Sequence, residues 1–254
     1  MYGLEGKRAL VLCGTRGIGF GVAQCLARYG STVTVSGADQ SRAAETAGRL
    51  PGAGNSSFAC DFRRPAEVAD KVAGTGPYDI LLLNSPGSAP GTVDQLSIAL
   101  LQQSLDLMLL SIQGAVTAAL PAMKRNRWGR FIAITSSSLS VPIDGLAASS
   151  ITRSAVQAYL KLLAESVGQY GITVNHVLPG KIDTDRLRAV ESATAEKLGT
   201  DAGSVRSATL GTIPLGRYGT PEDVGELVSF LASDQAAYIT GTGIRCDGGY
   251  IKAI

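Results

Sequence analysis

Short apolar runs alternate along the chain with longer segments whose apolar residues recur at helical spacing. The short runs predict strands near residues 7–13, 32–36, 57–60, 79–84, 130–135, 172–177 and 243–246. The longer segments predict helices near residues 17–29, 41–50, 65–73, 101–125, 151–169 and 221–232. Strands that alternate with helices predict an α/β fold. We expect one Rossmann-like domain over residues 1–254, with a doubly wound parallel sheet and helices on both faces.

Residues 181–217 do not fit this alternation. The segment is polar and rich in alanine, and no clean strand can be recognised in it. Long irregular connections in compact domains are often functional. We therefore expect this segment to act as a mobile lid.

Composition and charge narrow the function classes. The 254 residues are 45% hydrophobic and 17% charged, a mixture that excludes a disordered chain or a coiled coil. With 23 basic and 21 acidic residues, the chain has no electrostatic case for nucleic acid or an anionic membrane. No apolar run reaches the length needed to cross a bilayer, and residues 1–13 lack the features of a signal peptide. These features favour a cytoplasmic protein with a small-molecule partner.

The sequence contains few of the cysteine and histidine patterns that bind metal ions. The four cysteines are widely separated and form no C-x-x-C pair, and His176 is the only histidine. We expect no disulfide framework and no metal site. His176 lies in a predicted strand, where a buried, hydrogen-bonded side chain is the simpler interpretation.

A glycine-rich turn joins the first predicted strand to the first predicted helix. Gly14, Gly17 and Gly19 have the spacing G-x-x-G-x-G, which differs from the general G-x-G-x-x-G fingerprint. The first glycine would permit a tight turn, the second would let the backbone approach a pyrophosphate, and the third would let the helix pack closely. Free N–H groups at a helix N-terminus favour phosphate. Glycines that serve turn geometry alone are the alternative. The predicted nucleotide-binding residues are Gly14, Thr15, Arg16, Gly17, Ile18 and Gly19.

The end of the second predicted strand bears on which nucleotide binds. A carboxylate at this tip would accept a ribose 2′-hydroxyl and repel a 2′-phosphate. Gly37 occupies the tip, and Asp39 follows two positions later, where it could instead be a solvated turn residue. Arg16 could pair with a 2′-phosphate. We favour NADP as the cofactor, with NAD as the alternative.

Further motifs follow along the chain. Residues 13–19 read C-G-T-R-G-I-G, similar to the pattern T-G-x-x-x-G-x-G with cysteine in place of threonine and one residue fewer between the first two glycines. Residues 84–87 stand where N-N-A-G is expected. Residues 129–136 form a strand that ends in a serine, residues 171–175 read G-I-T-V-N, and residues 247–249 read D-G-G. On these motifs the chain resembles the short-chain dehydrogenase/reductase family over nearly its whole length, in the β-ketoacyl-carrier-protein reductase-like subgroup.

The resemblance implies roles for further residues. Asp61 would contact adenine, and Ser136 would be the catalytic serine. The family also implies a dimer or homotetramer that assembles through the helix near residues 151–169. The other cofactor-binding positions that it implies are Asn84, Pro179, Gly180, Ile182 and Thr184.

The catalytic set departs from the family pattern. The family uses Asn, Ser, Tyr and Lys, with the Tyr about a dozen residues after the Ser and the Lys four residues later. Counted from Ser136, these positions fall on Ser149 and Arg153, and the helix Asn falls on Met108. None of the eight tyrosines has a lysine four residues later. A serine hydroxyl is less acidic than a phenol, and arginine stays protonated.

Three functions stay open at this point. The first is an oxidoreductase that acts on a carbonyl or alcohol with an atypical proton donor, using Ser136, Ser149 and Arg153. The second is a protein that binds the cofactor without turnover, and the third is a lyase, isomerase or hydrolase on the same fold. Asp144, in the loop before Ser149, could reach a substrate, although a surface turn is the simpler interpretation.

Overall fold

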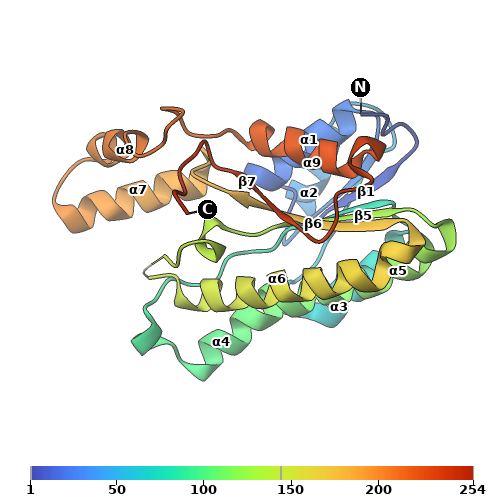
Figure 1. Ribbon diagram of the computed structural model, residues 1–254, viewed down its shortest axis with the longest axis horizontal. Coiled ribbons are helices and arrows are strands. Elements are labelled where there is room, and N and C mark those ends of the chain that lie inside the picture. The colour runs from blue at the N-terminus through green and yellow to red at the C-terminus, as the bar shows by residue number, and fades with distance from the viewer. Residues whose placement is uncertain (1, 144, 254) are drawn as a thin grey trace.

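A sheet of parallel strands organises the chain (Figure 1). The computed structural model describes residues 2–143 and 145–253, so that Asp144 lies outside the described residues. Within them, seven strands form one sheet in the order β3-β2-β1-β4-β5-β6-β7, and every pairing is parallel. The predicted doubly wound sheet is confirmed. The strands are β1 (Arg8–Val11), β2 (Thr32–Gly37), β3 (Ser56–Ala59), β4 (Ile80–Leu83), β5 (Gly129–Ile134), β6 (Ile172–Pro179) and β7 (Gly243–Cys246).

Helices cover both faces of the sheet (Figure 1). On one face lie α1 (Gly17–Arg28), α2 (Gln40–Gly48) and α9 (Pro221–Ala232). On the other lie α3 (Pro65–Thr75), α5 (Ser111–Asn126) and α6 (Ala147–Val167). Successive strand residues point to opposite faces, so the central strands supply both cores. In β4, for example, Leu81 and Leu83 join the α3–α5–α6 side, whereas Ile80 and Leu82 join the α1–α9 side.

The helix expected near residues 101–125 is longer and less regular than predicted. It begins with α4 (Ile98–Leu105), passes through a π-helical segment at Asp106–Leu110, and continues as α5. A π segment inserts one residue into the helical register and often marks a functional site. Met108, at the position of the family's helix Asn, is buried within this segment.

The same continuous helix corrects the expectation that no run could cross a bilayer. Ile98–Asn126 is long and apolar enough by length and composition, with a mean hydropathy of 1.5 in its most apolar window. A helix that packs in a protein core has the same composition, and α5 places Ile112, Val116 and Met123 in the core below the sheet. The helix is therefore weak evidence for a membrane.

Residues 181–217, expected to be irregular, contain α7 (Asp185–Leu198) and α8 (Ala202–Leu210). Each helix begins at a side-chain cap, from Thr184 and Asp201 respectively. Both helices extend beyond the carboxyl ends of the strands (Figure 1). Their apolar positions are too sparse to reveal a helix by periodicity. Movement of this segment as a lid stays a prediction.

Candidate active site

The predicted site residues meet at the carboxyl ends of the central strands. The strand order reverses at β1, so that the loops after β1 and β4 diverge and leave a crevice where ligands bind in such sheets. The glycine-rich turn follows β1, Asn84 follows β4, Ser136 follows β5, and Pro179 ends β6. The parallel topology thus brings together residues that are far apart in the sequence.

The glycine-rich turn leaves no room for side chains at two of its glycines. A methyl group built on Gly19 would overlap the carbonyl oxygen of Cys13, and one on Gly14 would lie 2.9 Å from Val11 Cγ1. Gly17 has a φ of +53°, in the left-handed region that favours glycine. The turn therefore has the compact form expected of a phosphate-binding loop.

The N-terminus of α1 is open to an anion. Arg16 is its N-cap residue, and its side chain makes no capping hydrogen bond, whereas a side chain caps α2, α4, α7, α8 and α9. The first N–H groups of a helix have no partner within the helix, and the helix dipole places positive charge there. This first turn fits the pyrophosphate of a dinucleotide, which Gly17, Ile18 and Gly19 would hold through their backbone N–H groups.

Two side chains from other loops fix the turn in place. Asn84 Nδ2 donates to the carbonyl oxygen of Cys13 over 3.3 Å. Thr184 lies against Gly17, because a methyl group built on that glycine would be 3.4 Å from Thr184 Cγ2. The ends of β4 and the start of α7 therefore line the same loop.

The tip of β2 carries no carboxylate for a ribose. A methyl group built on Gly37 would lie 2.7 Å from Thr15 Cγ2, so this tip packs against the glycine-rich turn. Asp39 Oδ1 accepts a hydrogen bond of 2.7 Å from the backbone N–H of Arg42 and caps α2. The interpretation of Asp39 as a turn residue agrees with this geometry. Arg16 is exposed and makes no ion pair with any described residue.

Asp61, the implied adenine contact, is already engaged. Its carboxylate accepts from the backbone N–H of Arg63 over 2.9 Å and from Arg63 Nε over 3.0 Å and Nη2 over 2.9 Å. These hydrogen bonds lower the pKa of Asp61. One face of the carboxylate is thus covered, and an adenine would have to share the residue with Arg63.

The nicotinamide-side positions hold the end of β6 against its neighbours. A methyl group on Gly180, the residue after Pro179, would lie 2.6 Å from Asp247 Cβ, so only glycine fits there. Ile182 is buried and pairs with Gly219 through a parallel bridge. This packing fixes where Thr184 begins α7.

Ser136, Ser149 and Arg153 lie around the carboxyl end of β5. Arg153 Nη1 donates to the carbonyl oxygens of Ile134 and Thr135, both over 3.0 Å, and Thr135 directly precedes Ser136. Arg153 Nε lies 3.3 Å from Ser149 Oγ, one helical turn earlier. Ser136 Oγ accepts from the backbone N–H of Ser138 over 3.1 Å. The three predicted catalytic side chains therefore converge.

The guanidinium of Arg153 is largely shielded from water. Burial, together with the positive charge of Arg186, lowers the pKa of Arg153 to about 10. That value is far above neutral pH, so the guanidinium stays charged. A partly desolvated charge acts more strongly on a nearby developing anion than a solvated one.

Comparison with known proteins gives the family. A family model described as enoyl-(acyl-carrier-protein) reductase matches residues 13–251. The 3-oxoacyl-[acyl-carrier-protein] reductase FabG of Pseudomonas aeruginosa is 32% identical over 255 residues, which cover 97% of this chain and 98% of the relative. The chain belongs to the short-chain dehydrogenase/reductase family.

Solved structures agree with this assignment. A 3-oxoacyl-(acyl-carrier-protein) reductase from Agrobacterium tumefaciens with NADP bound has a TM-score of 0.89 at 28% identity, covering 98% of this chain and 96% of the other. YwfH, an NADPH-dependent reductase involved in bacilysin biosynthesis, has a TM-score of 0.88 at 26% identity, covering 98% and 99%. The predicted family resemblance is confirmed, whereas the roles of individual site residues stay predictions.

The family's helix Asn has no polar substitute at Met108. Ser104 Oγ lies 3.7 Å from Met108 Sδ, and Thr152 Oγ1 donates to Ser104 Oγ over 3.0 Å. This small polar group joins α4 to α6 but is fully buried. It holds α6, and with it Ser149 and Arg153, in position.

Arg186 is a charged residue of the crevice that the sequence did not predict to lie there. Arg186, in the first turn of α7, lies directly over Gly87, where a methyl group would overlap its guanidinium. Its positive charge adds to burial in lowering the pKa of Arg153. In the sequence, Arg186 stands among Asp183, Asp185 and Arg188, a pattern typical of a solvated, charged helix. The spacing of these residues therefore does not predict that Arg186 enters the crevice.

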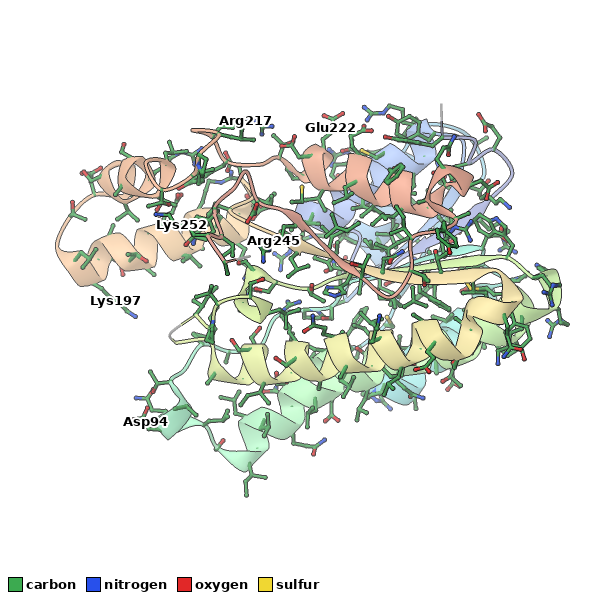
Figure 2. All side chains as sticks on the ribbon, viewed as in Figure 1. Asp94, Lys197, Arg217, Glu222, Arg245 and Lys252 are labelled. Carbon is green, nitrogen blue, oxygen red and sulfur yellow. The ribbon has the colours of Figure 1, made fainter. Side chains whose placement is uncertain are left out.

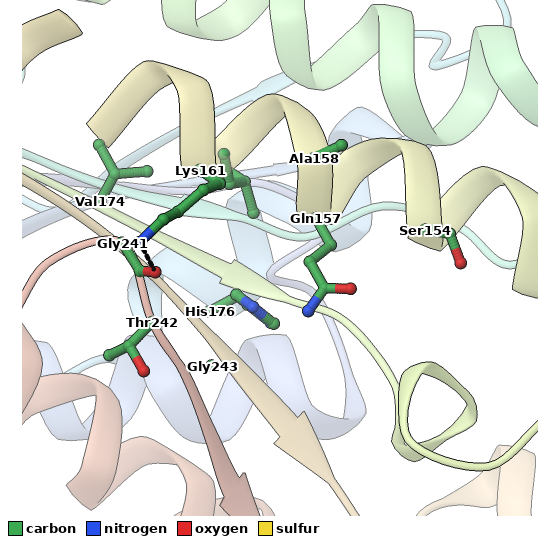
Figure 3. Close-up of a pocket in the computed structure, with 10 residues that line it drawn as sticks. Ser154, Gln157, Ala158, Lys161, Val174, His176, Gly241, Thr242 and Gly243 are labelled. Carbon is green, nitrogen blue, oxygen red and sulfur yellow. Dashed lines mark hydrogen bonds between the residues drawn. The ribbon is translucent and has the colours of Figure 1, made fainter. Parts of the chain in front are cut away.

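A separate cavity of about 360 Å³ lies beside α6, β6 and residues 241–243 (Figure 3). None of the predicted site residues lines it. Lys161 Nζ donates to the Gly241 carbonyl over 3.1 Å across its end. His176 Nδ1 lies 2.9 Å from Thr135 Oγ1, and burial lowers the pKa of His176. The histidine is thus a buried, hydrogen-bonded residue, as interpreted from the sequence.

One group of potential metal ligands occurs in the described residues, formed by Cys25, Glu222 and Glu226. Figure 2 places Glu222 near the start of α9, far from the crevice. Arg28 pairs with both glutamates, and Tyr29 donates to Glu226 over 2.6 Å. The guanidinium therefore already offsets one of the two negative charges.

Proposed function

We propose that this protein is an NADP(H)-dependent oxidoreductase that reduces a carbonyl or oxidises an alcohol. The observation that carries the proposal is the uncapped N-terminus of α1 beneath a glycine-rich turn in which Gly14 and Gly19 leave no room for a side chain. NADP-bound and NADPH-dependent relatives of the same family support the cofactor.

The preference for NADP follows from the tip of β2. Gly37 places no carboxylate at this tip to repel a 2′-phosphate, and Asp39 is committed to capping α2. Arg16 is free to donate a bidentate pair of hydrogen bonds to that phosphate. The cofactor would thus be held by Arg16 at the ribose and by the first turn of α1 at the pyrophosphate.

In the proposed catalytic step, a positively charged side chain stabilises the transition state, and no strongly acidic side chain is required. When bound, the nicotinamide supplies or accepts a hydride. Ser136 polarises the carbonyl, and Arg153 stabilises the negative charge that develops on its oxygen. The proton comes from the hydroxyl of Ser149 or from an ordered water. Since losing a positioned general acid costs about 10²–10⁴ in rate, turnover of simple ketones is expected to be slow.

The test begins with binding. Fluorescence titration is expected to show tighter binding of NADPH than of NADH, and Arg16→Gln to weaken NADPH binding while leaving NADH unchanged. Arg125→Gln, an exposed substitution at the far end of α5, is the matched control. Equal affinity for both nucleotides in the wild type would contradict the assignment of NADP, and no affinity for either would contradict the function.

A second candidate is cofactor binding without turnover. It is favoured by the hydrogen bonds that tie Arg153 to backbone carbonyls and to Ser149, because they restrain both groups. Absorbance assays against a ketone panel separate the possibilities. NADPH consumption supports an oxidoreductase, binding without consumption supports the second candidate, and product without nicotinamide change supports a lyase, isomerase or hydrolase.

We also propose a homodimer or homotetramer that assembles through α6. Ile151 and Leu162 on this helix are 43% and 67% exposed, and Leu110 beside it is 39% exposed. Burial of these side chains against a second copy would remove apolar surface from water. Sedimentation analysis tests this, with Leu162→Glu expected to shift the protein toward the monomer.

A further inference from the structure

Two arginines from different elements lie at the carboxyl ends of the neighbouring strands β4 and β5. Arg153 comes from α6 and contacts the end of β5, whereas Arg186 comes from α7 and lies over Gly87 after β4. Because β4 and β5 are adjacent strands, the two guanidinium groups lie at neighbouring strand ends, and the positive charge of Arg186 acts on Arg153. Their neighbours are Ser136 and Ser149, the residues proposed to surround the reacting group.

The nearby carboxylates do not neutralise this pair. Asp183 pairs with Arg188 and with Arg206 at 3.0 Å, and Asp185 pairs with Arg188 at 2.7 Å. Glu191 lies 3.8 Å from Arg206 and accepts a hydrogen bond from Tyr218. Within residues 2–143 and 145–253, neither Arg153 nor Arg186 has a carboxylate within 4.0 Å.

Two like charges held together without a counterion are unfavourable, and the cost grows as water is excluded. Natural proteins keep such arrangements where a ligand supplies the missing charge. Arg153 is held by three hydrogen bonds through Nε and Nη1, which leave Nη2 available as a donor. Arg186 is exposed and can adjust to a ligand.

We propose that Arg153 and Arg186 together bind a carboxylate of the substrate, adjacent to the carbonyl or alcohol that reacts. This inference rests on the proposed oxidoreductase function and names its substrate class: small 2-oxo or 2-hydroxy acids. A planar carboxylate can accept hydrogen bonds from both guanidinium groups at once.

The position of Arg153 and Arg186 favours a substrate carboxylate over two other anions, the cofactor pyrophosphate and the phosphates of a carrier-bound thioester. The cofactor pyrophosphate has its own donors at the first turn of α1, whereas the guanidinium of Arg186 lies over Gly87, after β4. The phosphates of a carrier-bound thioester would lie far from the reacting carbonyl, whereas Arg153 contacts the residue next to Ser136. The charge is therefore placed for an acid group close to the reaction centre.

The test measures binding and does not depend on turnover. The protein is saturated with NADP⁺, which cannot deliver a hydride, and is titrated by calorimetry at fixed ionic strength. The probes are pyruvate, 4-methyl-2-oxopentanoate and phenylpyruvate, each beside its methyl ester. We expect at least one acid to bind about 10- to 100-fold more tightly than its ester, as loss of a charge-assisted hydrogen-bonded pair implies.

The variants locate the effect. Arg186→Gln is expected to remove the preference for the acid while changing NADP⁺ affinity less than twofold. Arg188→Gln is the matched control, two residues along the same helix but paired with Asp183 and Asp185, and should retain the preference.

Three results would overturn the inference while leaving the proposed function intact. One is that no acid binds more tightly than its ester although NADP⁺ binds. Another is that Arg186→Gln weakens NADP⁺ as much as the acid, which would assign the pair to the cofactor. The third is that inorganic phosphate displaces the acid at equal concentration, which would assign the pair to a phosphorylated substrate. Failure of NADP⁺ to bind would instead refute the proposed function.

Discussion

The Gly19→Ala substitution tests whether the turn after β1 is as tightly built as the structure shows. The added methyl carbon would overlap the Cys13 carbonyl oxygen and lie 3.0 Å from Gly14 Cα and 3.1 Å from Cys13 C. All three neighbours are backbone atoms, and Asn84 holds the Cys13 oxygen from the other side. Relaxed carbon–carbon contacts are about 3.5–4.0 Å, so the turn itself must shift by about 0.5–1 Å.

The size of the effect follows from this clash. Overpacking of this kind costs about 1–3 kcal/mol, and replacing a helical glycine by alanine returns about 0.5–1 kcal/mol. We expect the free energy of unfolding to fall by about 0.5–2 kcal/mol. Because the same shift misaligns the N–H groups of α1, NADPH affinity should fall about 10- to 100-fold, the value of one or two charge-assisted hydrogen bonds.

Urea unfolding followed by the fluorescence of the single tryptophan measures stability, and NADPH fluorescence measures binding. Gly74→Ala in α3 is the matched control, because nothing lies within 4 Å of its added methyl group. That variant should gain about 0.5–1 kcal/mol and bind NADPH normally. A Gly19→Ala protein with wild-type stability and wild-type affinity would refute the reasoning about the turn.

Three further outcomes are expected. Ser149→Tyr combined with Arg153→Lys should raise ketone reduction by about 10²-fold or more, since it restores a positioned acid; no gain in a steady-state assay would show that the crevice is built for other chemistry. Burial raises the pKa of Cys25 to about 12 and that of Cys60 to about 11, so both thiols should resist alkylation at pH 7.5 in the folded protein, as mass spectrometry can check. Burial lowers the pKa of His176, so the unfolded chain binds a proton more readily below about pH 6.5, and the free energy of unfolding should fall there as the pH drops. In His176→Gln this component should be missing from urea titrations at pH 5 and 7.

The sheet could be predicted from the sequence because its strands are nearly continuous apolar runs. Ile80–Leu83 is buried on both faces, as are Gly129–Ile134 and Ile172–Pro179. The helix pair in residues 185–210 could not, because its buried residues are few and its charged side chains pair with one another. The π segment at Asp106–Leu110 was missed for a related reason, since one inserted residue barely alters helical periodicity.

For the candidate site, the glycine-rich turn and the convergence of Ser136, Ser149 and Arg153 could be predicted from spacing and family resemblance. The role of Asp39 as a cap depended on where α2 begins, which differs by a residue from the expected start. Arg186 could not be predicted, because whether a charged side chain joins a surface ion pair or enters a crevice is decided by tertiary neighbours.

Because the first turn of α1 lacks a side-chain cap, this end of the helix is less stable without the nucleotide than a capped helix would be. A Ser, Thr, Asp or Asn at an N-cap adds about 0.5–2 kcal/mol to a helix; α2, α4, α7, α8 and α9 begin at such residues, whereas α3 and α6, like α1, do not. Here the nucleotide itself would complete the helix, so recognition and local ordering become one event. Variants selected only for heat resistance would tend to acquire a capping side chain at residue 16. That side chain would occupy the N–H groups that the nucleotide needs and would weaken nucleotide binding.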